Sequence, residues 1–408
     1  MKLTVLGGSG IATPELITML ARAQERPALD VVLHGRTADK LQIVGGVCAR
    51  LAQEAVAPLA VSFTTDLDSA LEGADFVLNQ IRVGGYAARA FDEMFPRELG
   101  LPGEETVGPG GFSLTARTIP VVLDDCRAIE RRAPRAILIN LTNPASLIQY
   151  AISRYASVNS LGVCDAPVTM SQLVSAALGA PLAELEIDYL GMHHFGWITG
   201  VRQAGRDRML EVLARADWLA EKLSVHAEVI RAVGAVPGTY FKYYFHPDRM
   251  LAAQQGKAPR AESLLALESE LLAAYQAGQP EAVTRRNAHW FEEIVVPVLL
   301  ALMTDSRAAF FLNVPNKGAL NFMPEEAIVE VPVRVGRSGA GPDGPVGKAP
   351  DAVRALLQMN AAYETLAVEA IVERDRAKAL RALLLNPLIR TADQAKGTLE
   401  QVWRNVMP

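Results

Sequence analysis

Leu3-Thr4-Val5-Leu6-Gly7-Gly8-Ser9-Gly10 is the stretch of sequence that decides the class of fold. A short apolar strand runs into a glycine turn, and the apolar spacing of residues 15–23 predicts a helix directly after it. Glycines let the backbone approach a pyrophosphate, and the N-terminus of a helix offers free N–H donors, so the turn is a candidate dinucleotide site. An ordinary strand-to-helix turn is the alternative, because the third glycine of the full fingerprint is missing.

The alternation of strand and helix continues through the first half of the chain. Further apolar strands are predicted at 31–33, 75–78, 136–139 and 160–163. This order is typical of a doubly wound parallel sheet, so we predict an α/β protein with a Rossmann-like NAD-binding domain over residues 1–165. Residues 166–408 are expected to form a C-terminal α+β domain for substrate binding and assembly. Its predicted elements are helices at 209–233 and 261–277, a long helical stretch at 352–384 that is interrupted by at most one turn, a strand at 327–333 and a loop at 335–350.

The composition excludes several classes of protein. The 408 residues carry a formal net charge of -5, whereas a nucleic-acid partner requires a basic patch, so none is predicted. Cys48, Cys126 and Cys164 are too few for a disulfide framework and favour a reducing compartment. The longest apolar run, residues 294–303, is about half of the roughly 20 residues that span a bilayer, so we expect a cytoplasmic protein that does not enter a membrane.

The end of the second strand bears on the choice of cofactor. NAD-binding domains commonly place Asp or Glu there for the ribose hydroxyls, but this chain has His34-Gly35-Arg36-Thr37. A small residue followed by arginine suits a 2′-phosphate, so NADP is an alternative to NAD. The simpler interpretation is that Arg36 lies over the adenine or in solvent.

Polar residues follow the later strands, where ligands bind in such sheets. Asn79 and Arg82 come after the third strand, and Asn143 comes after the fourth. Glu105 lies in a glycine-rich stretch, residues 103–111, which is either a loop placed for function or a flexible surface loop. The proline after Asn143 favours an extended turn, from which the Asn143 side chain can point at a ligand.

Cys164, Asp165 and the pair His193-His194 are candidates for a metal site or a nucleophile. A cysteine at a strand end is buried filler, a nucleophile or a ligand, and paired histidines are ligands or structural. Together, Cys164 and His194 suit a catalytic divalent metal, and a Cys–His–Asp nucleophilic triad is the competing interpretation.

Tyr240 begins an aromatic cluster that extends to residue 245. Such clusters are usually core or interface aromatics. If Tyr240 acts as a base, a nearby cation must lower its pKa, and either a metal or Arg260 would do so.

A series of short motifs runs in a fixed order along nearly the whole chain. They are Gly7-Gly8-Ser9-Gly10, Thr13-Pro14-Glu15-Leu16, Ile81-Arg82-Val83-Gly84-Gly85, Glu105-Thr106-Val107-Gly108-Pro109-Gly110-Gly111-Phe112, Arg117-Thr118-Ile119-Pro120, Thr142-Asn143-Pro144-Ala145, Cys164-Asp165-Ala166-Pro167, Gly191-Met192-His193-His194, the segment 240–248, Asn313-Val314-Pro315-Asn316-Lys317-Gly318 and Asn386-Pro387-Leu388. In order and spacing they resemble glycoside hydrolase family 4, the NAD- and metal-dependent glycosidases.

The resemblance implies a mechanism and a substrate. NAD takes a hydride from C3 of the sugar, the C2 proton is removed, the C1–O bond breaks by elimination, water adds and the hydride returns. A 6-phospho-glucoside is the expected substrate. Another anionic hexoside, such as a 6-sulfonated α-glycoside, is an alternative, and an NAD(P)-dependent sugar dehydrogenase is a second one. The α or β preference stays open, because Asp165 resembles the α-acting members and residues 105–120 resemble the 6-phospho-β-glucosidases.

The resemblance also implies roles for individual residues. A divalent metal, expected to be manganese, is held by Cys164 and His194. Tyr240 removes the C2 proton and Asp165 is the general acid. Substrate contacts are expected from Arg89, Glu105, Asn143, Asp165, His193 and Arg260. Cofactor contacts are expected from Gly7, Gly8, Ser9, Gly10, Ile11, Arg36, Asn79, Arg82 and Asn143. The family usually has asparagine where this chain has His193, so His193 is assigned to the substrate pocket. A homodimer or homotetramer is expected.

Overall fold

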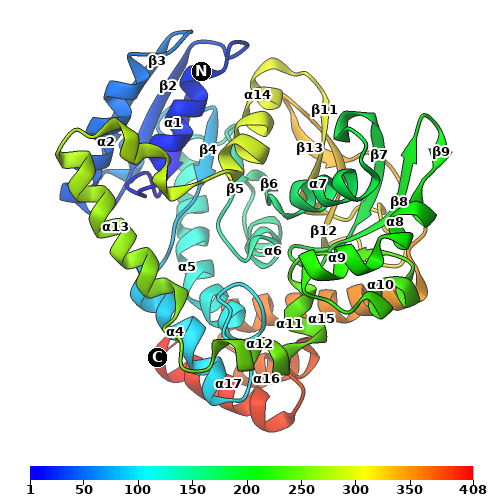
Figure 1. The fold of residues 1–408 in the computed structure, drawn as a ribbon. Coiled ribbons are helices and arrows are strands. Elements are labelled where there is room, and N and C mark those ends of the chain that lie inside the picture. The colour runs from blue at the N-terminus through cyan, green and yellow to red at the C-terminus, as the bar shows by residue number, and fades with distance from the viewer. Residues whose placement is uncertain (408) are drawn as a thin grey trace.

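A nine-stranded sheet is the centre of the computed structural model, which describes residues 1–407 (Figure 1). Its strand order is β13-β12-β11-β6-β5-β4-β1-β2-β3, and the six strands from the first half of the chain are parallel. These six strands are β1 (Lys2–Leu6), β2 (Leu29–His34), β3 (Leu59–Thr64), β4 (Phe76–Asn79), β5 (Ile137–Asn140) and β6 (Asn159–Gly162). Antiparallel strands then extend the sheet, namely β11 (Ala308–Pro315), β12 (Ile328–Gly336) and β13 (Gly339–Pro342).

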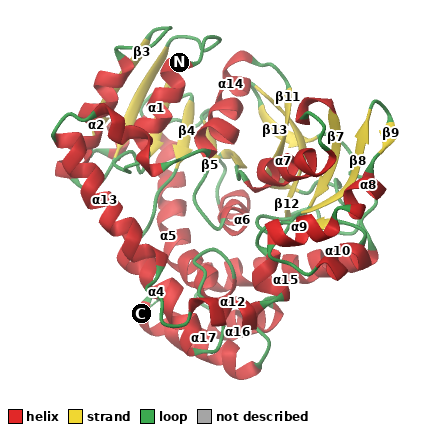
Figure 2. Cartoon of the chain, in the orientation of Figure 1, coloured by secondary structure: helices red, strands yellow, loops and turns green. Residues whose placement is uncertain are grey.

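Both faces of the parallel strands are apolar, because helices cover both faces (Figure 2). Leu3 and Val5 of β1 face one core, and Leu6 faces the other. The first core includes α1 and α2, and the second includes α5 and α6. The helices of this half are α1 (Thr13–Arg22), α2 (Ala38–Ala52), α3 (Leu67–Leu71), α4 (Gly85–Glu98), α5 (Gly108–Arg132), α6 (Ala145–Tyr155) and α7 (Ala166–Leu178).

The second half adds a small antiparallel sheet and most of the remaining helices. The sheet contains β7 (Leu185–Leu190), β8 (Trp197–Gln203), β9 (Arg206–Asp207) and β10 (Val236–Pro237). The helices are α8 (Met209–Ala214), α9 (Ala216–Leu223), α10 (Ala227–Val233), α11 (Phe241–Phe245), α12 (Pro247–Gln254), α13 (Arg260–Gln276), α14 (Val296–Thr304), α15 (Asp351–Glu373), α16 (Arg376–Leu385) and α17 (Ala392–Asn405). Short turns of other helix types are η1 (Leu182–Glu184), η2 (Pro280–Arg286) and η3 (Phe291–Val295). Among residues 1–407, no helix is both long enough and apolar enough to cross a bilayer.

The predicted α/β class and parallel sheet are confirmed, and two local predictions are wrong. The helix predicted over 209–233 is three helices, because Ser224 takes a left-handed conformation (φ 56°) that ends the second of them. The loop predicted over 335–350 contains β13, which pairs with β12 across a tight turn at residues 337–338. Strands β3 and β11 and the four strands of the small sheet, β7 to β10, were not predicted.

The sheet joins the two halves of the chain. β11 lies beside β6, with Asn313 in register with Gly162. A Cβ atom added to Gly162 would approach that of Asn313 to 2.9 Å, so glycine allows the close contact. The division into domains at residue 165 stays a prediction, and the nine-stranded sheet contains strands from both sides of it.

Candidate active site

A cleft of about 920 Å³ opens at the carboxyl ends of β1, β2, β4, β5 and β6. This is the edge at which ligands bind in open parallel sheets. Segments from the second half of the chain close the cleft, among them the turn before α11 and the start of α13. Apart from Gly8, Asn79 and His193, every predicted site residue lines it. Those residues are Gly7, Ser9, Gly10, Ile11, Arg36, Arg82, Arg89, Glu105, Asn143, Cys164, Asp165, His194, Tyr240 and Arg260.

The glycine turn after β1 is shaped to admit a dinucleotide pyrophosphate. Gly7 has a φ of +81°, and a Cβ atom there would come within 2.8 Å of the Gln80 carbonyl oxygen. Gly8 faces inward, where a Cβ atom would meet that of Leu33 at 2.7 Å. The turn leads into α1, a helix of ten residues whose N-terminus faces the cleft. Compact backbone before a helix N-terminus fits a diphosphate.

The end of β2 has glycine where NAD sites typically have an acidic residue, and it is tightly packed. A Cβ atom at Gly35 would lie 2.9 Å from the Ser9 hydroxyl. Arg36 follows, is exposed and lines the cleft. No hydrogen bond or ion pair holds its side chain among residues 1–407. The ribose end of the cleft therefore has an available cation and no carboxylate at position 35.

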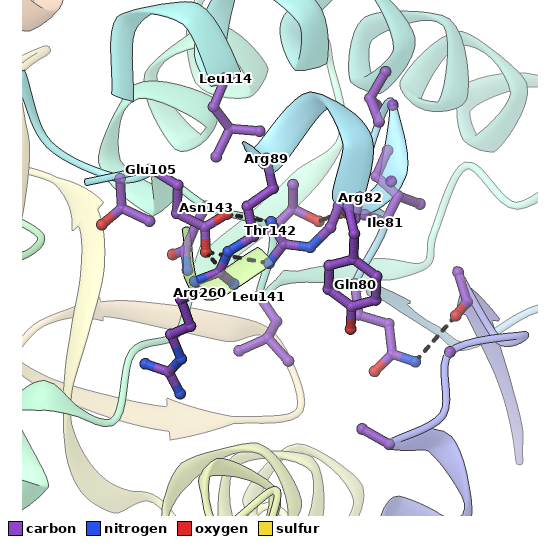
Figure 3. A pocket seen from close by; sticks show the side chains of 18 of the residues that line it. Gln80, Ile81, Arg82, Arg89, Glu105, Leu114, Leu141, Thr142, Asn143 and Arg260 are labelled. Carbon is purple, nitrogen blue, oxygen red and sulfur yellow. Dashed lines mark hydrogen bonds and ion pairs between the residues drawn. The ribbon is translucent and has the colours of Figure 1, made fainter. Parts of the chain in front are cut away.

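Arginines and carboxylates are paired in one wall of the cleft (Figure 3). Glu105 accepts ion pairs from Arg82 and from Nη1 of Arg89, the latter at 2.7 Å. Arg89 also pairs with Glu93 at 2.7 Å, one turn along α4. Glu105 is thus neutralised by two guanidinium groups. Arg260 enters the cleft from α13.

Arg286 and Asn79 differ in their position relative to the cleft. Arg286 lines the same cleft, stacks on Trp290 at 5.0 Å and has no carboxylate partner among residues 1–407. Burial, foremost, lowers its pKa, and the nearby Arg260 adds to this effect. Asn79 is buried below the cleft floor, where it donates to Asn140 (3.0 Å). The structure therefore does not place Asn79 in the cleft wall.

Cys164, His193 and His194 form a group that fits a metal ion. All three are buried, and one ligand atom from each lies within 4.8 Å of those of the other two. Burial lowers the pKa of His193 to about 3 and that of His194 well below its usual value, so both imidazoles stay neutral and keep a free lone pair. Nε2 of His193 is buried without a hydrogen-bond partner. A thiolate and imidazole donors this close together suit a divalent transition metal. His193 was predicted to line the substrate pocket, but it lines a separate small cavity of about 20 Å³ instead.

Cys164 lies at the start of α7. The backbone N–H of Ala166 points to its Sγ at 3.5 Å, and Oδ1 of Asp165 is 3.8 Å away. Burial raises the pKa of the Cys164 thiol well above its usual value. A thiol in this setting becomes a thiolate when a cation binds it.

Tyr240 lies against the metal group. Its ring stacks on that of His194 with centroids 3.5 Å apart and planes inclined by 11°. Burial, followed by the nearby Glu104, raises the pKa of Tyr240 well above its ordinary value. Thr106 lies between these groups, since its hydroxyl donates to Glu104 (3.1 Å) and is 3.2 Å from Nδ1 of His194. Without a bound cation, the Tyr240 hydroxyl keeps its proton.

Asp165 is paired with a histidine that the sequence did not point to. Its Oδ2 lies 3.1 Å from Nε2 of His289, and Glu293 is 4.0 Å from the same nitrogen. His289 is about half exposed. This pair connects the Asp165 carboxyl with solvent, as a group that exchanges protons requires.

Sequence reasoning missed several residues of this site. They are Glu104, Thr106, Arg286 and His289. Glu104 and Thr106 flank Glu105 in the glycine-rich stretch, so the motif was a usable signal for them. Arg286 and His289 come from a 3-10 turn and the segment after it, where no periodicity marks a functional residue.

Comparison with known proteins gives the family. The model of the family 4 glycosyl hydrolases matches residues 2–180, and that of the family 4 glycosyl hydrolase C-terminal domain matches residues 189–389. The chain is 31% identical over 431 aligned residues to a probable 6-phospho-beta-glucosidase of Bacillus subtilis (strain 168), covering 98% of this chain and 95% of the relative. It is 30% identical to a 6-phospho-beta-glucosidase of Escherichia coli (strain K12), with 97% and 93% covered.

Solved structures agree with this assignment. The 6-phospho-beta glucosidase of Thermotoga maritima, solved with manganese, NAD+ and glucose-6-phosphate, has a TM-score of 0.89 at 26% identity, over 99% of this chain and 98% of that one. A 6-phospho-alpha-glucosidase from gut microorganisms, in complex with NAD and Mn2+, has a TM-score of 0.88 at 26% identity, over 99% and 97%. These matches extend along the whole cleft-forming chain, and we conclude that this protein belongs to the family 4 glycosyl hydrolases.

Proposed function

We propose that this chain is an NAD- and divalent-metal-dependent glycosidase that cleaves 6-phospho-glucosides. One observation carries the proposal: the Cys164–His194 group and the Tyr240 ring stacked on it share one cleft with the dinucleotide turn. A simple dehydrogenase needs the turn and a proton acceptor, but not a thiolate–imidazole group beside a tyrosine. When bound, NAD would accept and return a hydride, and a divalent metal would polarise hydroxyl or carbonyl oxygens of the sugar.

Two residues, Tyr240 and Asp165, are assigned to the two proton transfers of the reaction. We assign removal of the C2 proton to Tyr240, because its ring is fixed against His194 and a cation at that group would lower its pKa. We assign protonation of the leaving oxygen to Asp165, which lines the cleft and can regain a proton through the exposed His289. Asn143 and Arg89 line the space between these groups and would orient the sugar.

Arg260 and Arg286 are the groups that we assign to the 6-phosphate. Both line the cleft, and neither has a carboxylate partner among residues 1–407. In contrast, Arg82 forms an ion pair with Glu105, and Arg89 forms one with Glu93. Two guanidinium groups without counter-charges suit a dianion better than an uncharged hydroxymethyl group.

Arg286→Met is expected to weaken the binding of glucose 6-phosphate by about tenfold to a hundredfold, the effect of removing a hydrogen-bonded charge. Calorimetric titration with glucose 6-phosphate and with glucose measures the effect. The matched control is Arg285→Met, because Arg285 is adjacent, exposed and paired with Glu270 at 2.7 Å. Equal weakening for both sugars, or none in Arg286→Met, would contradict the assignment.

The activity itself is tested with paired nitrophenyl glucosides. The α and β anomers are offered with a 6-phosphate, a 6-sulfonate or neither, in the presence of NAD and manganese. Release of nitrophenol from a 6-phosphate without accumulation of NADH supports the proposal, and it also shows the anomeric preference. Steady accumulation of NADH would indicate a dehydrogenase instead. Turnover of the 6-sulfonate alone would show that the substrates are 6-sulfonated rather than 6-phosphorylated glucosides.

The ribose end of the cleft should accept NADP as well as NAD. We expect NADP to bind within about tenfold of NAD, since Arg36 has no ion-pair partner among residues 1–407 and residue 35 is glycine, not an acidic residue. Arg36→Glu should reduce the affinity for NADP by about tenfold or more and leave that for NAD nearly unchanged. Fluorescence titration of the two reduced cofactors measures both constants. A wild-type protein that binds NAD alone would contradict this expectation.

The expected assembly rests on the resemblance, and the expected compartment rests on the composition. We propose a homodimer or homotetramer in the cytoplasm, and light scattering of the purified protein tests the oligomeric state. Support for the compartment is limited to the free cysteines, Cys48, Cys126 and Cys164, which a reducing environment would keep available.

A further inference from the structure

Two segments from the second half of the chain carry the arginines that we assign to the 6-phosphate. Arg260 is the first residue of α13, and Arg286 is the last residue of η2. α13 packs on α4 and η2 packs on α1, and both of these supporting helices belong to the first half of the chain. The positions of the two guanidinium groups therefore depend on how the two segments are fixed to α1 and α4.

Glu15 of α1 fixes the segment that carries Arg286. Its side chain is buried, and its Oε2 accepts a hydrogen bond from the backbone N–H of Ala288 at 2.8 Å. Asn287, the residue before Ala288, has a left-handed backbone (φ 53°), so the chain turns sharply there. Glu15 does not line the cleft, and no ion pair joins it to Arg286, although both residues lie within the described part of the chain. Glu15 therefore holds the turn and leaves the guanidinium available for a ligand.

Glu93 of α4 fixes the segment that carries Arg260 in the same way. It is buried, and its Oε2 accepts a hydrogen bond from the backbone N–H of Ala261 at 3.0 Å. α13 begins after Pro259, which gives no side-chain cap, so the carboxylate of Glu93 caps this helix N-terminus from another element. Oε1 of Glu93 pairs with Arg89 at 2.7 Å. Both carboxylate oxygens are thus engaged, and neither pairs with Arg260.

We infer that Glu15 and Glu93 are positioning residues for the 6-phosphate, because each fixes, through one backbone N–H, the segment whose arginine binds it. The inference rests on the proposed function, since it uses the assignment of Arg260 and Arg286. A carboxylate that paired with either guanidinium would have to be displaced by the phosphate, whereas a carboxylate on a backbone N–H does not compete with it. Both arginines are then in place before the sugar binds, which reduces the cost of ordering them.

The test is the binding of glucose and of glucose 6-phosphate to the full chain in the presence of NAD, measured by calorimetry. The dissociation constant of glucose divided by that of glucose 6-phosphate isolates the contribution of the phosphate. Glu15→Met keeps a side chain of similar volume without the acceptor, and should lower this ratio by about threefold to thirtyfold. Glu15→Gln keeps an acceptor and should restore most of the ratio. In an Arg286→Met background, Glu15→Met should change the ratio no further.

Glu93 and Arg260 give a second, independent pair. Glu93→Met should also lower the ratio by about threefold to thirtyfold, and should have no further effect on it in an Arg260→Met background. Loss of the ion pair between Glu93 and Arg89 would weaken the binding of both sugars. That effect cancels in the ratio, so the second pair tests the phosphate alone.

Glu130→Met is the matched control, because Oε1 of Glu130 accepts the backbone N–H of Ser157 at 2.6 Å and Glu130 does not line the cleft. Its ratio should equal that of the wild type. NAD binding and the thermal transition report whether each variant has folded.

Two results would overturn the inference and leave the proposed function standing. One is an unchanged ratio in Glu15→Met and Glu93→Met when Arg260→Met and Arg286→Met both lower it. The other is a loss caused by either glutamate variant that persists after its arginine has been replaced, since the glutamate would then act on the structure in general. If the two arginine variants themselves leave the ratio unchanged, the phosphate assignment of the proposed function fails, and this inference fails with it.

Discussion

Replacing Cys164 by alanine is expected to lower turnover of a 6-phospho-glucoside by about a thousandfold or more. The thiolate anchors the metal, and losing several kcal/mol of charge stabilisation corresponds to that factor. NAD should still bind with wild-type affinity, because the dinucleotide turn after β1 lies on another part of the cleft wall. Turnover with added manganese and fluorescence titration of the cofactor measure the two effects.

Cys126→Ala is the matched control for this variant. Cys126 is also buried and free, but it lies on the core-facing side of α5 and does not line the cleft. Its replacement should reduce the thermal transition temperature slightly and leave turnover near that of the wild type. If the Cys164→Ala variant retained metal-dependent turnover, the Cys164 thiolate would not be a ligand of the metal. The metal assignment would then lose its basis.

Replacing Tyr240 by phenylalanine is expected to lower turnover by about a hundredfold to ten-thousandfold, the usual contribution of a general base. The change removes one oxygen and keeps the ring that stacks on His194 at 3.5 Å, so metal binding should persist. Exchange of the C2 hydrogen with deuterated solvent should fall in parallel with turnover. That exchange is followed by NMR of the sugar, in the presence of NAD and manganese.

Tyr155→Phe controls for the loss of a tyrosine hydroxyl elsewhere. Tyr155 is exposed at the end of α6, away from the cleft, and its replacement should leave exchange unchanged. If Tyr240→Phe retained full exchange at C2, a group other than Tyr240 would have to accept the C2 proton. Thr106 and Glu104 would then be the groups to examine, since both lie beside the same ring.

The parallel part of the fold could be read from the sequence, because its strands are buried on both faces. β1, β4 and β5 are continuous apolar runs next to glycine or asparagine, and each prediction of them was met. β3 was missed because it is an edge strand whose residues alternate between half-buried and exposed, which weakens the apolar signal. β11 pairs along its length with β12, the next strand, but its place beside β6 comes from a contact far away in sequence that no local pattern reveals.

The site was predicted in part for a similar reason. Cys164 and Asp165 follow a strand, and the rule that ligands bind at strand ends points to them. Glu364 shares a small cavity with His193, about 170 residues away along the chain, only because α15 packs against α5 and α6. Arg286 is similar, since nothing in its 3-10 turn distinguishes it from the exposed Arg285 beside it. Tertiary packing alone supplies these contacts.

The pairing of β6 with β11 limits how the chain can be truncated or combined with a relative. A fragment that ended before residue 308 would keep the dinucleotide turn but leave β6 as an open edge, with unpaired N–H and C=O groups that invite strand addition by a second copy. Such a fragment should aggregate rather than serve as a cofactor-binding module. In chimaeras with relatives, Gly162 and Asn313 have to come from the same parent protein, because they are in close contact. Neither half of the chain can therefore be transferred to another protein by itself.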